Sequence, residues 1–97
     1  MKKLKKEYLD WETSKSANKR LAYAYYNSEF GLLKTDKEGT NRHIYARYTG
    51  DWKFMKTDKE SLNRLFYAIH TGDFDFLKDD EDWGNRLEYK RHVASID

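Results

Sequence analysis

Apolar and polar positions along the chain recur at a constant interval, so that the same order of residues comes round several times. The segment 33–51 begins with a leucine and a charged run and then carries Asn-Arg, Tyr-Ala and Thr-Gly-Asp. The segment 55–73 repeats this order with most residues identical and no gap, a third copy begins at Leu77, and a more divergent copy begins at Trp11. The chain therefore contains an internal repeat, and a repeat of this length is typical of a solenoid in which each unit buries its apolar side on the next.

Each repeat carries the signals of one α-helix. Thr35 and Glu38 have the spacing of a capping box, which recurs at Thr57 and, with acidic residues, at Asp79. A glycine then lies where a left-handed C-terminal cap is expected, at Gly50 and again one repeat later at Gly72. These signals predict helices near residues 14–26, 36–48, 58–70 and 80–92.

The predicted helices lead to two further expectations, one about the aspartates near their starts and one about a buried face. Asp36, Asp58 and Asp80 would lie in the first helical turn, where the helix dipole favours negative charge. In the third repeat the spacing i, i+3, i+4, i+7 predicts a buried apolar face made of Leu62, Leu65, Phe66 and Ile69.

The segments that follow each glycine, 51–55 and 73–77, predict a second element in each repeat. An acidic residue starts each segment and can cap one further helical turn, whose aromatic and aliphatic side chains would fill the gap to the next helix. The alternation of apolar and polar residues at 74–76 leaves a short strand as the alternative.

The repeat resembles the variant leucine-rich repeat, a helical repeat family of HEAT-like appearance. The similarity lies in a leucine or methionine, an aspartate three residues later and an arginine six residues after that: Leu33, Asp36 and Arg42; Met55, Asp58 and Arg64; Leu77, Asp80 and Arg86. The resemblance implies one α-helix and one 3-10-like helix per repeat in a right-handed solenoid. This chain has a shorter period than that family, a Thr-Gly-Asp turn without proline, and none of the cysteines that bind an iron–sulfur cluster in some members.

We therefore expect an all-α fold, a small right-handed α-solenoid of four 22-residue repeats with an N-terminal capping helix. It would form one helical-repeat domain over residues 1–97, with a basic cap at 1–10 and repeats at 11–32, 33–54, 55–76 and 77–97.

Composition narrows the classes of protein to consider. The 97 residues are 38% hydrophobic, 37% charged and 16% aromatic, which suits a thin stack and argues against disorder. The net charge of +2 makes no strong case for nucleic acid, and without cysteine there is neither a disulfide framework nor a thiolate site. No apolar run is long enough to span a bilayer, so a cytoplasmic protein is expected. The richness in Lys, Asn, Asp and Tyr would fit a virus-borne accessory protein.

A recurring polar stripe supplies the candidate binding residues. Its arginine and aromatic positions lie three residues apart and would share one helix face, and some positions depart from the repeat toward aromatic or basic character, Lys90 among them. The candidates are Arg20, Arg42, Arg64, Arg86, Tyr26, Tyr48, His70, His92, Tyr25, Arg47 and Arg91.

The same arginines also admit a purely structural interpretation. They could pair with the aspartates at 36, 58 and 80 of an adjacent repeat, and Tyr23, Tyr45, Tyr67 and Tyr89 could be core residues between repeats with their hydroxyls at the rim.

No catalytic, metal or cofactor site is predicted. His43, His70 and His92 have no metal-ligand spacing, and the acidic run at 79–82 lacks the alternating ligands and glycine of a calcium loop. There is no phosphate-binding glycine loop and no nucleophile elbow.

The sequence therefore favours a non-catalytic binding module for another protein, such as a small adaptor or inhibitor. One alternative is a nucleic-acid-binding protein that uses the arginine–tyrosine stripe with help from Lys2, Lys3, Lys5 and Lys6. Another is a self-assembling repeat protein. No membrane partner is expected, and the oligomeric state stays open.

Overall fold

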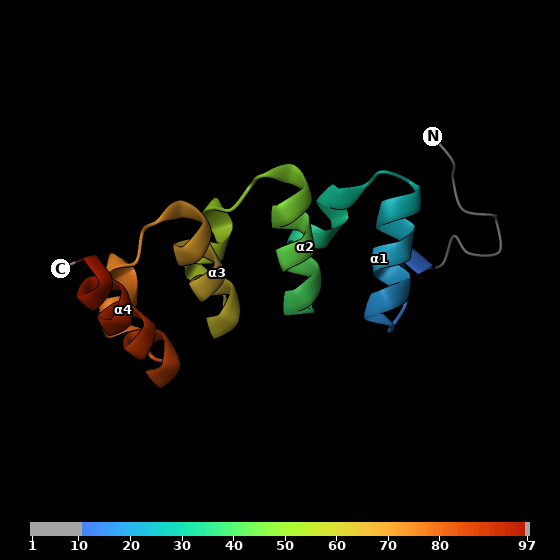
Figure 1. The fold of residues 1–97 in the computed structure, drawn as a ribbon. Helices are drawn as coiled ribbons and strands as arrows, with labels where there is room; N and C mark the ends of the chain where they lie inside the picture. Colours follow the sequence, from blue (N-terminus) through green and yellow to red (C-terminus); the bar gives the residue numbers. More distant parts are fainter. Residues whose placement is uncertain (1–10, 97) are drawn as a thin grey trace. The chain divides into compact units, whose positions relative to one another are not determined.

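A computed structural model of the chain describes residues 11–96 and divides into two compact units, residues 1–51 and 52–97. The predicted basic cap at 1–10 lies outside the described residues, and the single domain over 1–97 stays a prediction. The first unit contains α1 (Ala17–Tyr26), the 3-10 helix η2 (Phe30–Thr35) and α2 (Gly39–Thr49). The second contains η3 (Lys53–Thr57), α3 (Ser61–Thr71), η4 (Asp75–Asp79) and α4 (Trp83–Ile96) (Figure 1).

Every regular element among residues 11–96 is helical, and α-helices alternate with 3-10 helices. The predicted fold class, an all-α repeat of the solenoid type with one α-helix and one short helix per repeat, is confirmed. The alternative of a strand at 74–76 is wrong, because Phe74 is the N-cap of η4 and the next two residues belong to that helix.

The α-helices begin later than predicted. Glu38 and Glu60 are the N-caps of α2 and α3, and neither uses its side chain as a cap. Thr35 and Thr57, expected to cap these helices, instead end the preceding 3-10 helices. The capping-box interpretation is therefore wrong for these two repeats, since the chain continues as a 3-10 helix through the residue that was to start the box.

Asp36, Asp58 and Asp80 each lie between a 3-10 helix and an α-helix, not in the first helical turn as predicted. Each has an extended backbone, with ψ between 145° and 147°. Oδ2 of each accepts a hydrogen bond of 3.0 Å from the backbone N–H two residues later. This local side-chain bond turns the chain into the helix.

The predicted glycine caps are confirmed. Gly50 has φ 77° and Gly72 has φ 79°, and their N–H groups donate to the carbonyls of Ala46 and Ala68. The first repeat has no glycine at this position, and Ser28 adopts the left-handed conformation there with φ 54°.

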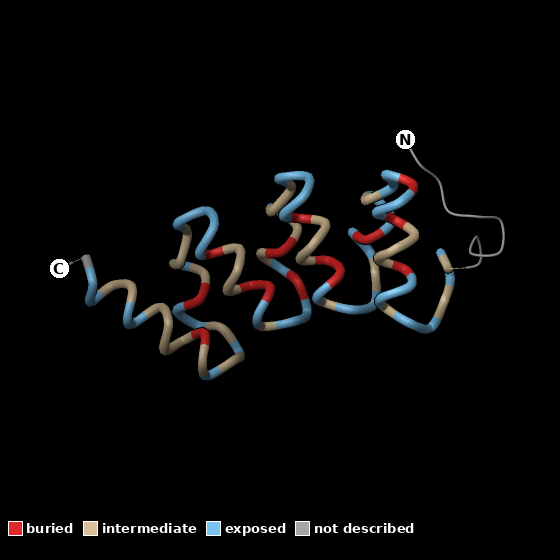
Figure 2. The backbone as a smooth tube through the Cα atoms, turned by 45° about the vertical axis from the view of Figure 1, so that its right-hand side comes forward, coloured by how far each residue is buried: buried red, intermediate tan, exposed pale blue. Residues whose placement is uncertain are grey.

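The core is a thin layer of alanines and larger aliphatic residues. In the first unit Ala24 of α1, Leu33 of η2 and Ala46 of α2 are almost completely buried. In the second unit Met55, Ala68 and Leu77 play the same part (Figure 2). The short helix η2 packs on α1 and α2, and η4 packs on α3 and α4, so each of α1, α2 and α3 presents alanine where another element approaches closely.

The apolar face predicted for α3 is not buried as a whole. Leu62 and Ile69 are 57% and 56% exposed, whereas the buried residues of α3 are Asn63, Arg64 and Ala68. The prediction was wrong because it assumed that the most hydrophobic side chains of the helix are the buried ones. In α3 the buried polar residues instead form hydrogen bonds with neighbouring segments.

Candidate functional site

Buried ion pairs occupy the arginine positions of the repeat. In the first unit Arg20 Nε and Nη2 donate to the two carboxylate oxygens of Asp36, at 2.7 and 3.0 Å. In the second unit Arg64 holds Asp80 in the same way, at 2.8 and 3.0 Å. The remaining nitrogen, Nη1, donates to a backbone carbonyl six residues before each arginine. These forked contacts match the planar guanidinium to a planar carboxylate.

Asparagine side chains complete the two clusters. Asn41 donates from its amide nitrogen to the Ala17 carbonyl at 3.1 Å and to Asp36 Oδ2 at 3.2 Å. Asn85 makes the corresponding bonds to the Ser61 carbonyl and to Asp80 Oδ2. Each buried carboxylate is thus bound by an arginine, an asparagine and a backbone N–H, which satisfies the polar groups that burial would otherwise penalise.

The pairing changes the pKa values of the partners. The hydrogen bond from Arg64 lowers the pKa of Asp80 below its ordinary value of 3.8, although burial acts in the opposite direction. At Asp36 burial acts most strongly and upward, but Arg20, the N–H of Glu38 and Asn41 together lower the pKa. Both carboxylates are therefore ionised at neutral pH.

Three of the four candidate arginines are consequently part of the structure and not of an exposed stripe. Arg20, Arg42 and Arg64 are 8%, 5% and 8% exposed. Arg42 also donates to the carbonyl of Asp36 at 2.7 Å. The prediction that these residues offer their guanidinium groups to a ligand is corrected by this burial. Arg86, the fourth, is only half-buried.

The aromatic positions of the stripe stack on the segments that start the 3-10 helices. Tyr48 lies against Phe30 with ring centroids 4.8 Å apart and ring planes 12° from parallel. The pairs His70 with Trp52 and His92 with Phe74 are closer, at 3.8 and 4.0 Å, and their planes are 18° and 12° from parallel. These three candidates therefore have a structural role, although Tyr48 keeps 63% of its surface exposed.

The second tyrosine row serves the fold through its hydroxyl and ring. Tyr45 donates to Asp51 Oδ2 at 2.8 Å, and the Lys34 ammonium lies 3.2 Å from the same oxygen. Lys56 lies 5.9 Å from the centre of the Tyr67 ring in the second unit. At Tyr23, burial raises the pKa of the phenol, and the carboxylates of Glu12 and Glu29 raise it further. These contacts support the structural interpretation of the tyrosines.

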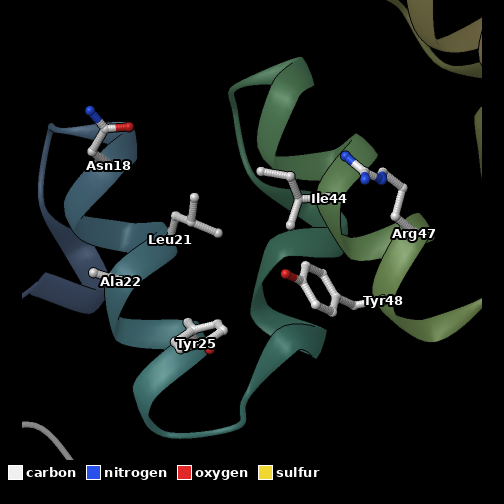
Figure 3. Close-up of a pocket in the computed structure, with 7 residues that line it drawn as sticks. All are labelled: Asn18, Leu21, Ala22, Tyr25, Ile44, Arg47 and Tyr48. Carbon is white, nitrogen blue, oxygen red and sulfur yellow. The ribbon is translucent and has the colours of Figure 1, made fainter.

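A groove between α1 and α2 brings together three of the candidates, of which two depart from the repeat and one, Tyr48, belongs to the row of stacked rings. Tyr25, Arg47 and Tyr48 line a pocket of about 410 Å³ together with residues that sequence reasoning did not select: Asn18, Leu21, Ala22 and Ile44. The two helices lie side by side and run in the same direction, because η2 carries the chain back between them (Figure 1). Leu21 and Ile44 point toward each other across the groove (Figure 3).

Three of the four groove residues that the sequence analysis did not select are apolar, and the fourth is the polar Asn18. Leu21 and Ile44 are intermediate in burial and resemble ordinary core positions, and Asn18 is exposed. Only the side-by-side placement of α1 and α2 makes them one surface. The i, i+3, i+4, i+7 spacing of Asn18, Leu21, Ala22 and Tyr25 could have identified the α1 side of the groove as one helix face.

The remaining candidates lie outside this groove. Tyr26 is 47% exposed and meets Tyr25 edge to face at 5.5 Å. Arg91 of α4 is exposed and forms an ion pair of 3.2 Å with Glu88. The stripe predicted as one surface is therefore divided among buried pairs, stacked rings, the groove and isolated surface positions.

Comparison of the chain with protein-family models, with curated proteins and with solved structures finds no match. Within residues 11–96, no helix has the length and apolar character needed to cross a membrane. The same part of the chain holds no cluster of three histidine, cysteine or acidic side chains that could bind a metal ion.

Proposed function

We propose that the protein is a non-catalytic binding module, an adaptor or inhibitor, whose α1–α2 groove takes up a segment of another protein. The observation that carries the proposal is the composition of the groove, whose lining combines the apolar residues Leu21, Ala22 and Ile44 with Tyr25, Tyr48 and Arg47. Tyrosine and arginine are among the residues that most often dominate binding energy at protein interfaces.

The shape of the groove favours a helical segment. Two parallel helices offer a furrow into which an amphipathic helix can place apolar side chains at i, i+3 and i+4. Arg47 is exposed, so an acidic residue of the partner next to those apolar anchors would meet it. The partner chemistry is thus an amphipathic helix with leucine-like anchors and a carboxylate on one flank.

The nucleic-acid alternative rests on arginines that are buried. Because Arg20, Arg42 and Arg64 are at most 8% exposed, the row that was to contact phosphates is turned inward. We therefore place a protein partner first, with the cytoplasm as its compartment and the variant leucine-rich repeat as the architecture that the chain resembles.

The test is a displayed library of amphipathic helical peptides panned on the purified protein. We expect enrichment of peptides with apolar residues at helical spacing and an acid beside them. The enriched peptides should shift the amide resonances of α1 and α2. Arg47→Ala should weaken their binding by about tenfold, which corresponds to about 1.4 kcal/mol for the lost arginine–carboxylate contact.

Two variants serve as matched controls. Lys37→Ala removes an exposed cation of the first unit that does not line the groove, and Arg91→Ala removes an exposed arginine from the second unit. Neither should weaken the enriched peptides more than about twofold, the range of an exposed side chain away from an interface core. Enrichment that is unaffected by Arg47→Ala would contradict the proposal, and so would binding of oligothymidylate through the groove with no peptide enriched.

A further inference from the structure

The second unit has a basic pocket where α4 begins. Lys78 from η4 and Trp83, Arg86, Leu87 and Lys90 from α4 line a hollow of about 200 Å³. Trp83 is 69% exposed, more than any other large apolar residue of the described structure. These five residues, the α4 basic pocket, carry three positive charges beside two apolar side chains.

Arg86 is held in the same way as the arginines that bind aspartate. Its Nη1 donates to the carbonyl of Asp80, six residues earlier, at 2.6 Å, as Nη1 of Arg20 and Arg64 does to Ser14 and Asp58. In Arg20 and Arg64 this anchor leaves Nε and Nη2 to grip a carboxylate. Within residues 11–96 no group accepts a hydrogen bond from Nε or Nη2 of Arg86. These two nitrogens are therefore available to bind a carboxylate in the way that Arg20 and Arg64 do.

Lys78 differs from the lysines at the same position of other repeats because no aspartate stands at the position with which those lysines pair. Lys34 and Lys56 form ion pairs of 3.2 and 3.3 Å with the aspartates that follow the glycine caps. Ser95 stands at the corresponding position of the last repeat. Among the described residues Lys78 consequently has no carboxylate partner, and its ammonium adds to the charge of the pocket.

Lys90 is much larger than the residue at the same position of the other repeats, which is alanine in each. The corresponding residues Ala24, Ala46 and Ala68 are completely buried, where another helical element packs closely. Lys90 is exposed, and its long charged side chain cannot enter such a contact. The face of α4 is therefore unsuited to receive another repeat in the register used inside each unit.

A second copy of this chain stacked head to tail in the repeat register lacks the acid that Arg86 would need. The position of Asp36, Asp58 and Asp80 in the first repeat is occupied by Ser14, whose hydroxyl accepts from the Ser16 N–H at 3.1 Å. A head-to-tail contact in the repeat register would thus set Arg86 against a hydroxyl. The chemistry points to an acid from a different protein.

We propose that the α4 basic pocket binds an acidic segment of a partner protein, with one aspartate carboxylate held by Nε and Nη2 of Arg86. Lys78 and Lys90 receive flanking acids, and an apolar side chain of the segment covers Trp83 and Leu87. This surface belongs to the second unit and shares no residue with the α1–α2 groove, so it stands independently of the function proposed above.

The chain itself supplies the probe. Residues 77–83, Leu-Lys-Asp-Asp-Glu-Asp-Trp, present the aspartate that Arg64 binds, with an apolar residue at each end. This peptide, acetylated and amidated, is titrated into the 15N-labelled protein at low salt. We expect saturable shifts of the α4 amides and of the Arg86 Nε–H, and none with a peptide whose four acids are replaced by Asn and Gln.

The variants separate a specific contact from general attraction between charges. Arg86→Lys keeps the charge but loses the fork, and should weaken the peptide by at least about fivefold. Lys90→Gln should weaken it by about threefold. The matched control Arg91→Gln removes one charge from an exposed position of the same helix and should change affinity less than about twofold, within the about 0–1 kcal/mol range of exposed pairs.

Four results would overturn the proposal. They are no shift with the acidic peptide, an equal loss with Arg91→Gln, shifts of α4 by oligothymidylate but not by the peptide, and a dimer in light scattering that Arg86→Lys dissociates. If circular dichroism shows Arg86→Lys to be unfolded, Lys90→Gln decides, because this residue is exposed and its replacement leaves the fold intact. An unchanged affinity of that variant would then refute the site.

Discussion

The two units share their interior and differ in what they expose. Arg20 with Asp36 and Arg64 with Asp80 have nearly the same forked geometry, with bonds of 2.7 and 3.0 Å in one unit and 2.8 and 3.0 Å in the other. On the outside, the first unit has a groove with tyrosines and an arginine, whereas the second has an exposed Leu62 and a basic pocket on α4. The repeated residues are therefore those that the packing of each unit requires. The residues that depart from the repeat account for the differences between the two surfaces.

Removing the arginine of one buried ion pair should have the largest effect on stability. Arg64→Ala leaves Asp80 as a buried carboxylate without its counter-ion, and should lower the free energy of unfolding by about 3–5 kcal/mol. Arg20→Ala should cost a similar amount, because the two pairs are equally buried. Urea denaturation followed by circular dichroism measures both.

The double variant Arg64→Met/Asp80→Leu sharpens this comparison. Replacing both charges with apolar side chains removes the unpaired buried charge, so part of the lost stability should return. The recovery is incomplete, because Asn85 and the Asp82 N–H lose Asp80 as their acceptor. A double variant as unstable as Arg64→Ala alone would mean that the pair contributes more than its charges.

Acid should destabilise both units together. The native pKa values of Asp36 and Asp80 lie below the ordinary value of 3.8, so the folded state binds fewer protons than the unfolded state. Their contribution to stability is present above this ordinary value and is lost as the pH falls through the lowered native values. Urea midpoints measured from neutral pH down to about pH 2 should fall mainly below about pH 4. A midpoint that falls mainly near neutral pH would instead implicate histidines.

Ser28→Gly makes the first repeat like the second and should stabilise the first unit. Ser28 has φ 54°, a left-handed conformation that favours glycine. Relieving it should raise the free energy of unfolding by about 1 kcal/mol. Thermal denaturation checks the sign, with Gly50→Ser expected to lower stability by a similar amount because Gly50 has φ 77°.

The smallest effect is expected on the exposed side of α3. Leu62→Gln and Ile69→Gln should each change stability by no more than about 0.5 kcal/mol, because more than half of each side chain is already in water. A loss of about 2 kcal/mol or more in urea denaturation, the size expected for an aliphatic core residue, would show that these residues are buried in solution.

The sequence predicted the repeat, one α-helix in each copy and the glycine caps, because these depend on local chemistry that each copy restates. Helix starts were misplaced at Thr35 and Thr57, since a 3-10 helix and an α-helix share turn residues and differ only in hydrogen-bond spacing. The sequence identified the row of arginines, but whether their side chains are buried or exposed depends on which element packs against them. The geometry of Arg20 toward Asp36 settles this, and pattern alone left both interpretations open.

The candidate site was predicted only in part. Tyr25 and Arg47 were selected as departures from the repeat, and the structure brings them into one groove with Tyr48. Leu21 and Ile44 could not be assigned to it, because a surface formed by two parallel helices combines residues from separate repeats. The α4 basic pocket was missed because it also draws on two elements, although its lysine at position 90 stands where every other copy has alanine.

The spacing of the ion pairs also bears on how quickly each unit folds. Each arginine reaches an aspartate 16 residues later, and each bridging asparagine reaches a carbonyl 24 residues earlier. Contacts between residues this close in sequence require only short loops to close, and chains with such local topology fold in about microseconds to milliseconds. Newly made repeats can therefore fold onto one another while the chain is still being synthesised, with each aspartate locking the helix that precedes it.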